Sequence, residues 1–132
     1  MADTHHPTVL FIDDDRDILK LMNYVFSEEP VELITRRTPE EGLRVLAQRP
    51  IDCVFLDIHF TLAPEGFGFI TALHNLADDR RIPCLVTSAM DAREVEHRAM
   101  ALGARKFIPK PFSPTEVMDE IRTALAPRAG HS

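Results

Sequence analysis

The chain has 132 residues, 45% of them hydrophobic and 27% charged, a balance typical of one soluble globular domain. Its formal net charge of −6 and the absence of a basic tract argue against direct nucleic-acid binding. No apolar run is long enough to cross a bilayer, and residues 1–7 lack the apolar segment of a signal peptide. We therefore expect a cytoplasmic protein without membrane contact, folded over residues 8–126 and flexible at 1–7 and 127–132.

The first half of the chain predicts two strands, each followed by a helix. The apolar run Thr8–Ile12 predicts the first strand. The helix after it has apolar positions with the spacing of one helical face, at Ile18, Leu19, Met22, Val25 and Phe26. A second strand is expected at Val31–Thr35, and Thr38-Pro39-Glu40-Glu41 opens a helix with a capping threonine and a first-turn proline. The buried side of this second helix is expected at Leu43, Leu46 and Ala47.

The second half continues the alternation. Apolar runs predict three more strands, at Ile51–Leu56, Ile82–Val86 and Lys106–Pro109. The helix after the first of them carries its apolar stripe at Phe69, Ile70, Leu73 and Leu76. A fourth helix is expected to open at Asp91 and to end at Gly103, which suits a left-handed C-cap. Ser113 should cap the last helix, whose stripe is Val117, Ile121, Ala124 and Leu125.

Five strands alternating with five helices predict an α/β fold, a doubly wound parallel sheet covered by helices on both faces. Strands covered on both faces should be continuously apolar, and Val9–Ile12, Cys53–Leu56 and Cys84–Val86 are. Cys53 and Cys84 lie within these runs, so we expect them to be free, buried thiols rather than a disulfide.

Polar residues directly follow four of the predicted strands, at the edge where open parallel sheets bind ligands. In chain order they are Asp13, Asp14 and Asp15, then Asp57, then Thr87 and Ser88, then Lys110. Converging carboxylates repel one another, and a hard divalent cation such as Mg²⁺ fits oxygen ligands. A carboxylate can also accept a phosphoryl group, with the metal and a lysine supplying positive charge and a threonine a hydroxyl donor. Each residue alone has an ordinary structural interpretation, and Asp15 is expected only to cap the next helix. It is their joint placement that indicates a site.

Five segments, in order and spaced as in one family, carry a resemblance. They are Val9–Asp15, Cys53–Asp57, Leu85–Ala89, Gly103-Ala104 and Phe107–Pro111. In these segments the chain resembles the response-regulator receiver domains of two-component signalling, in particular the single-domain chemotaxis-regulator type. The resemblance extends from Thr8 to about Leu125 and implies a flavodoxin-like (βα)5 fold with strand order 2-1-3-4-5.

The resemblance also implies roles for the acidic residues. Asp57 would be the phosphoacceptor, Asp14 would bind Mg²⁺ directly, and Asp13 would assist. His59 would lend its backbone carbonyl to the metal, and its side chain is a candidate for setting the lifetime of the phosphorylated form. The loop expected at Ile58–Gly66 departs from the family pattern, because it lacks the usual Met-Pro pair and places its glycine one residue later.

Three further residues match the switch of the family. Lys110 would contact the phosphoryl group, Thr87 would be the switch hydroxyl, and Phe107 the switch aromatic, with a cis Lys110–Pro111 bond. Phosphorylation would then change the surface formed by the fourth helix, the fifth strand and the fifth helix. The implied partners are a sensor histidine kinase or histidine phosphotransfer protein and an unidentified downstream effector. The chain would be a signalling phosphoacceptor, capable only of its own phosphorylation and dephosphorylation, and not otherwise an enzyme. A homodimer through the switch surface is an option, with charged contacts from Arg93, Arg98, Arg105 and Lys106, although these four also suit a solvated surface.

Alternative interpretations remain at this point. A haloacid-dehalogenase-like phosphatase would use Asp13 as nucleophile and Asp15 as general acid, but Asp17 stands where that family has Thr or Val. A flavodoxin-like flavin-binding module would need a glycine- and hydroxyl-rich phosphate loop in place of three aspartates. A receiver working without phosphorylation is a further option, disfavoured because every matching position is filled. The sequence is compatible both with a stand-alone regulator and with one domain of a longer protein.

Overall fold

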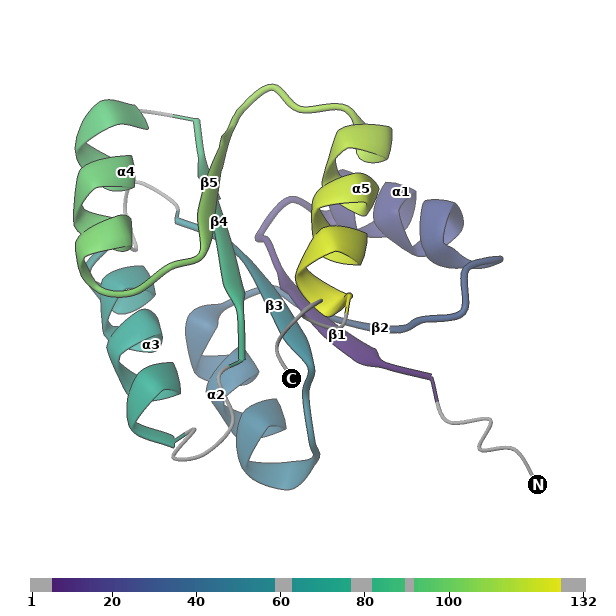
Figure 1. Cartoon of the computed structure of the whole chain (residues 1–132), viewed down its shortest axis with the longest axis horizontal. Coiled ribbons are helices and arrows are strands. Elements are labelled where there is room, and N and C mark those ends of the chain that lie inside the picture. Colours follow the sequence, from purple (N-terminus) through teal and green to yellow (C-terminus); the bar gives the residue numbers. More distant parts are fainter. Residues whose placement is uncertain (1–5, 59–62, 77–81, 90–91, 127–132) are drawn as a thin grey trace.

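Five strands alternate with five helices in the part of the chain that the structure describes (Figure 1). The computed structural model describes residues 6–58, 63–76, 82–89 and 92–126. The strands are β1 (Thr8–Ile12), β2 (Glu32–Arg36), β3 (Cys53–Asp57), β4 (Cys84–Ser88) and β5 (Lys106–Pro109). The helices are α1 (Arg16–Phe26), α2 (Pro39–Gln48), α3 (Ala63–Leu76), α4 (Ala92–Ala101) and α5 (Pro114–Leu125). Within the described ranges, no helix combines the length and apolar character needed to cross a membrane.

All neighbouring strands are parallel, and their order is β2-β1-β3-β4-β5, which confirms the predicted fold. Helices α1 and α5 cover one face of the sheet, while α2, α3 and α4 cover the other (Figure 1). Because the strands run the same way, their carboxyl ends meet at one edge of the sheet: Asp57 and Ser88 are the last residues of β3 and β4, and Asp13 and Lys110 follow β1 and β5. The strand order reverses between β1 and β3, which is where such sheets bind ligands.

The core has two layers, one on each face of the sheet, because successive strand residues point to opposite sides. Leu10 of β1 lies in the layer beneath α2, α3 and α4, whereas its neighbour Phe11 lies beneath α1 and α5 and stacks on Phe55 at 4.4 Å between ring centroids. Cys53 and Cys84 belong to opposite layers. Both are buried and free, as predicted.

Several predicted helix ends are confirmed. Asp15, Thr38 and Ser113 are the N-caps of α1, α2 and α5, and each side chain accepts hydrogen bonds from backbone N–H groups of the first turn. Gly103 follows α4 with a φ of 110°, a conformation that favours glycine. The Lys110–Pro111 bond is cis, as the resemblance implies. The predicted cap Asp91 lies outside the described residues.

Two details of the prediction are wrong. The fully buried positions of α2 are Pro39, Gly42 and Val45. The predicted Leu43 and Leu46 are partly buried and pack against the core, whereas the predicted Ala47 is exposed. Helix α2 can bring this face close to β1 because Gly42 has no side chain; a Cβ there would overlap the end of the Ile12 side chain, which would have to shift. The loop expected to reach Gly66 is shorter, since α3 already begins at Ala63. Pro64 suits the first turn of a helix, where the missing N–H of proline has no intrahelical partner to lose.

Candidate functional site

The loop between β1 and α1 carries the first acidic residues into the fold. Asp13 directly follows β1 and is only 1% exposed. Its Oδ1 accepts a hydrogen bond of 2.9 Å from the backbone N–H of Asp15. Asp15 turns away to cap α1, accepting from the N–H groups of Asp17 and Ile18. The three consecutive aspartates are therefore divided between the site and the helix cap, as predicted for Asp15.

Asp13, Asp14 and Asp57 form a compact carboxylate cluster. One oxygen from each lies within 4.8 Å of the others. Asp57 ends β3 and is 7% exposed. The Lys110 ammonium, which follows β5, lies 3.2 Å from Asp57 Oδ2 and 3.6 Å from Asp13 Oδ2. Residues that are far apart in sequence thus converge at the carboxyl edge of the sheet, as the strand-end pattern predicts.

Burial and mutual charge shift the pKa values of the ionisable groups in this cluster. Burial first, and then the neighbouring Asp57 carboxylate, raise the pKa of Asp13 from 3.8 to about 7. Burial also raises the pKa of Asp57, although the Lys110 ammonium opposes the shift. Burial alone would lower the pKa of Lys110, but the Asp57 and Asp13 carboxylates outweigh it and raise that pKa. Lys110 therefore keeps its proton, and its ammonium is the cation that lies against the Asp13 and Asp57 carboxylates.

The donor set fits a hard divalent cation. Asp13 Oδ2 is buried and finds no hydrogen-bond partner among the described residues. Buried carboxylate oxygens ordinarily have a partner, and a cation would supply one here. Three carboxylates with one lysine leave excess negative charge, and Mg²⁺ combines carboxylate ligands with waters and phosphate oxygens. The residues present can hold this metal.

Thr87 lies beside Asp57 in the register of β3 and β4 and is completely buried. Its hydroxyl donates a hydrogen bond to the carbonyl of Ile108 on β5. Ser88, the last residue of β4, is also buried. The fourth strand therefore places a hydroxyl next to the Asp57 carboxylate, and that hydroxyl donates to the backbone of the edge strand β5.

Residues 9–122 match the sequence profile of the response regulator receiver domain. The chain belongs to the response regulator receiver domain family. It is thus a component of two-component signalling, and the phosphatase and flavin-binding alternatives are not favoured. The position of Asp15 as a helix cap independently disagrees with its role as general acid in a phosphatase.

This receiver domain is similar to a part of two larger response regulators. It is 30% identical over 118 residues to the response regulator GtcR of Aneurinibacillus migulanus, covering 89% of this chain and 47% of GtcR. It is 29% identical over 116 residues to the heme response regulator HssR of Staphylococcus aureus, covering 88% of this chain and 50% of HssR. The chain therefore spans about half the length of the curated relatives it matches.

Solved receiver domains share its fold. The receiver domain of NtrX from Brucella abortus superposes with a TM-score of 0.77 at 26% identity, covering 89% of this chain and 97% of that one. A response regulator from Chloroflexus aurantiacus gives a TM-score of 0.80 at 22% identity, covering 93% and 100%. At 22% identity, the second comparison speaks to the fold alone.

Phe107 of the receiver domain is buried, 9% exposed, in the core layer that also contains Val95 and Ala99 of α4. Two of the four predicted surface cations, Lys106 and Arg98, have partners within the chain. Lys106 pairs with Glu120 of α5 at 2.9 Å, and the Arg98 guanidinium lies 4.2 Å from the centre of the Phe67 ring on α3. These contacts tie α4 and β5 to their neighbours.

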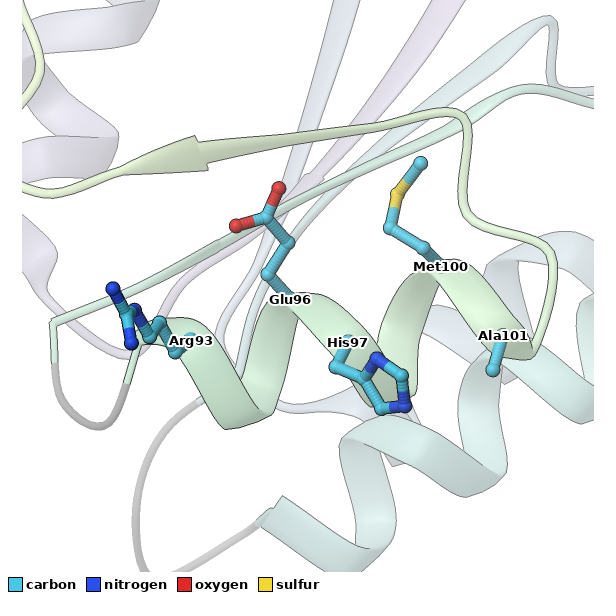
Figure 2. Close-up of a pocket in the computed structure, with 5 residues that line it drawn as sticks. All are labelled: Arg93, Glu96, His97, Met100 and Ala101. Carbon is cyan, nitrogen blue, oxygen red and sulfur yellow. The ribbon is translucent and has the colours of Figure 1, made fainter.

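Two hollows lie near these elements. One, of about 370 Å³, adjoins the carboxylate cluster through Lys110 and is otherwise mostly apolar, lined by Ile18, Leu21, Ala89, Pro111, Phe112 and Pro114. The other, of about 570 Å³, runs along α4 and is lined by Arg93, Glu96, His97, Met100 and Ala101 (Figure 2). All five residues of the second hollow come from one helix, so it is a feature of the α4 surface and separate from the carboxylate site.

Not every residue of the site was identified from sequence, and one prediction falls outside the described part. His59 lies outside the described residues. Arg37, which follows β2, was missed: its guanidinium donates a hydrogen bond of 3.2 Å to the backbone carbonyl of Asp14. The predicted second strand ends at Thr35, two residues earlier, and no pattern in the sequence connects Arg37 with the first loop.

Proposed function

We propose that this receiver domain accepts a phosphoryl group on Asp57 in the presence of Mg²⁺. The observation that carries the proposal is the joining of the three carboxylates of Asp13, Asp14 and Asp57 with the Lys110 ammonium at one edge of the sheet. Asp13, Asp14, Asp57 and the His59 backbone carbonyl would hold the metal. When bound, Mg²⁺ would neutralise charge on the carboxylates and on the phosphoryl oxygens.

Phosphoryl transfer here requires little from the protein beyond positioning and charge. A carboxylate oxygen of Asp57 forms the new bond to phosphorus. The bond between phosphorus and the donor's leaving atom breaks, and the leaving atom takes the bonding electron pair. Lys110, 3.2 Å from Asp57, keeps its proton and offers it as a hydrogen-bond donor to the transferred group. Burial of Asp57 keeps most water away from the acyl phosphate until hydrolysis returns the carboxylate and inorganic phosphate.

The change of surface would begin at Thr87. Its hydroxyl is held by the Ile108 carbonyl and would have to exchange that bond for a phosphoryl oxygen. Phe107 lies next to Ile108 on β5 and packs with residues of α4, so a shift of Thr87 would be transmitted to the surface of α4, β5 and α5. A downstream effector, or a second copy of the chain, would read this surface.

The phosphodonor would be a sensor histidine kinase or a histidine phosphotransfer protein. The mostly apolar hollow beside Lys110 supports this, because it offers a docking surface next to the acceptor. We place the protein in the cytoplasm, where such donors act, and assign it no enzymatic activity beyond its own phosphorylation and dephosphorylation. A receiver working without phosphorylation is less well supported, since all four charged groups of the site are present and converge.

Intact-protein mass spectrometry after incubation with acetyl phosphate tests this function. We expect one phosphoryl adduct that requires Mg²⁺, disappears with EDTA and is absent from Asp57→Asn. An Asp52→Asn control, which alters an exposed aspartate at the opposite edge of the sheet, should form the adduct normally. The absence of any adduct in the unaltered protein would favour the phosphorylation-independent alternative.

A further inference from the structure

The loop after β2 lies directly against the loop after β1. The Asp13 N–H donates to the carbonyl of Arg36 at 3.1 Å, at the end of the β1–β2 pairing where Ile12 lies opposite Arg36. One residue further, the Arg37 guanidinium donates to the carbonyl of Asp14 at 3.2 Å. Arg36, the last residue of β2, and Arg37, the first residue after it, thus hold two consecutive acidic residues of the loop after β1. One of these bonds is made by a side chain, so it depends on the identity of residue 37.

Arg37 is itself fixed from the other side. Its backbone N–H donates to Glu41 Oε1 at 3.0 Å, and the Glu41 N–H donates to the Thr38 hydroxyl at 3.1 Å. These bonds tie the loop to the first turn of α2. Helix α2 in turn packs closely on β1 through Gly42. The guanidinium therefore reaches Asp14 from a backbone that the fold holds in place.

We propose that Arg37 is a positioning residue for the metal-binding half of the site, an inference that rests on the proposed function. The loop of Asp13 and Asp14 carries like charges that repel each other and Asp57. A hydrogen bond to the main chain at Asp14 opposes the spreading of this loop and keeps both carboxylates directed at one point. Groups that orient metal ligands commonly contribute 10- to 100-fold to metal affinity.

The charge of Arg37 and its hydrogen bond to Asp14 affect Mg²⁺ affinity in opposite directions, so the two contributions can be distinguished. A guanidinium near a cation site repels the cation, so loss of charge alone would tighten Mg²⁺ binding. Loss of the positioning bond would weaken it. Arg36 provides the matched control: it is an exposed arginine next in the chain, and its guanidinium donates to the Thr35 carbonyl within its own strand at 2.7 Å. Arg36→Ala removes the same charge without touching Asp14.

Mg²⁺ titration of the metal-free protein, followed by NMR amide shifts, measures the affinity independently of phosphorylation. We expect Arg37→Ala to bind Mg²⁺ about 10-fold more weakly than the unaltered chain and Arg36→Ala to remain within about twofold of it. In EDTA, the thermal unfolding midpoints of both variants should lie within a few degrees of the midpoint of the unaltered chain. The phosphorylation rate of Arg37→Ala should recover when Mg²⁺ is raised in proportion to its weaker binding.

The outcomes separate the inference from the function beneath it. Three results would overturn the positioning role and leave the phosphoacceptor intact. Arg37→Ala could bind Mg²⁺ as tightly as the unaltered chain or more tightly, or Arg36→Ala could lose as much Mg²⁺ affinity as Arg37→Ala. The third result is a phosphorylation rate of Arg37→Ala that stays low at saturating Mg²⁺. Failure of the unaltered chain to bind Mg²⁺, or unchanged binding by Asp13→Asn, would instead overturn the proposed metal site and Arg37's role with it.

Discussion

Replacing Asp13 by asparagine should stabilise the metal-free protein. Asp13 Oδ2 is buried without a hydrogen-bond partner among the described residues, and Asp57 lies nearby with the same charge. Asparagine retains an oxygen to accept the 2.9 Å bond from the Asp15 N–H, and its amide can donate to Asp57. The substitution therefore removes an unfavourable charge and preserves the local geometry.

The magnitude follows from the pKa of Asp13. Burial raises this pKa from 3.8 to about 7, and each pKa unit corresponds to about 1.4 kcal/mol, so ionised Asp13 costs the folded state at most about 4 kcal/mol. This figure already includes the attraction to Lys110, which opposes the shift. Solvent relaxation reduces the cost further, so we expect a gain of about 2 kcal/mol at pH 8.

The sign of the pH dependence is defined by the same pKa. Below about pH 4, Asp13 is protonated in both the folded and unfolded chains, and its charge costs nothing. The cost grows as pH rises through the interval between 3.8 and about 7 and is complete above it. The advantage of Asp13→Asn should therefore fall to less than half between pH 8 and pH 5.

Urea unfolding in EDTA, followed by far-UV circular dichroism at these two pH values, measures the difference. Asp52→Asn is the control, because Asp52 is exposed and accepts a 2.8 Å hydrogen bond from the Thr8 N–H, so its replacement should bring no gain. The reasoning is refuted if Asp13→Asn is no more stable than the unaltered chain at pH 8, or if its advantage is the same at both pH values.

Three further predictions concern the scaffold. Gly103→Ala should lower the free energy of unfolding by about 1–2 kcal/mol, because the φ of 110° at this position is unfavourable for alanine. Gly68→Ala within α3 should instead raise the free energy of unfolding by about 0.5–1 kcal/mol, because alanine favours the helix and nothing lies within 4 Å of its Cβ. Equal changes for the two variants in urea unfolding would contradict this. Thr38→Ala should lower the free energy of unfolding by about 1 kcal/mol, because α2 loses its N-cap. An unchanged midpoint of urea unfolding would show that the cap does not stabilise the protein. Cys53 and Cys84 should resist a thiol reagent in the folded protein and react in urea, since burial raises both thiol pKa values, that of Cys53 to about 12; rapid reaction of either in the folded state would be inconsistent with the core described.

Much of the carboxylate site could be predicted because the signal is local. The end of each apolar run is visible in the sequence, and parallel strands bring their carboxyl ends to one edge of the sheet. Asp13, Asp57 and Lys110 could therefore be assigned to one site from the sequence alone. The caps were equally accessible, since Asp15 and Thr38 satisfy N–H groups of the helix turn that immediately follows.

Other features depend on contacts that no local pattern encodes. The inward face of α2 is set by the close approach of Gly42 to Ile12, and the helical period alone pointed to Ala47. Arg37 reaches Asp14 across 23 positions of sequence, through a hydrogen bond to a main-chain oxygen that any residue could offer. The beginning of α3 was placed too late because the family pattern of the loop after Asp57 was extended past Pro64.

We propose that Asp57 is the residue that becomes phosphorylated, and chemical trapping of the phosphorylated side chain tests this directly. Reduction with borohydride after incubation with acetyl phosphate and Mg²⁺ converts an aspartyl phosphate to homoserine, and peptide sequencing by mass spectrometry then locates it. We predict homoserine at position 57 alone, and none when EDTA replaces Mg²⁺. Homoserine at position 13, or none at any aspartate in the presence of Mg²⁺, would contradict the account.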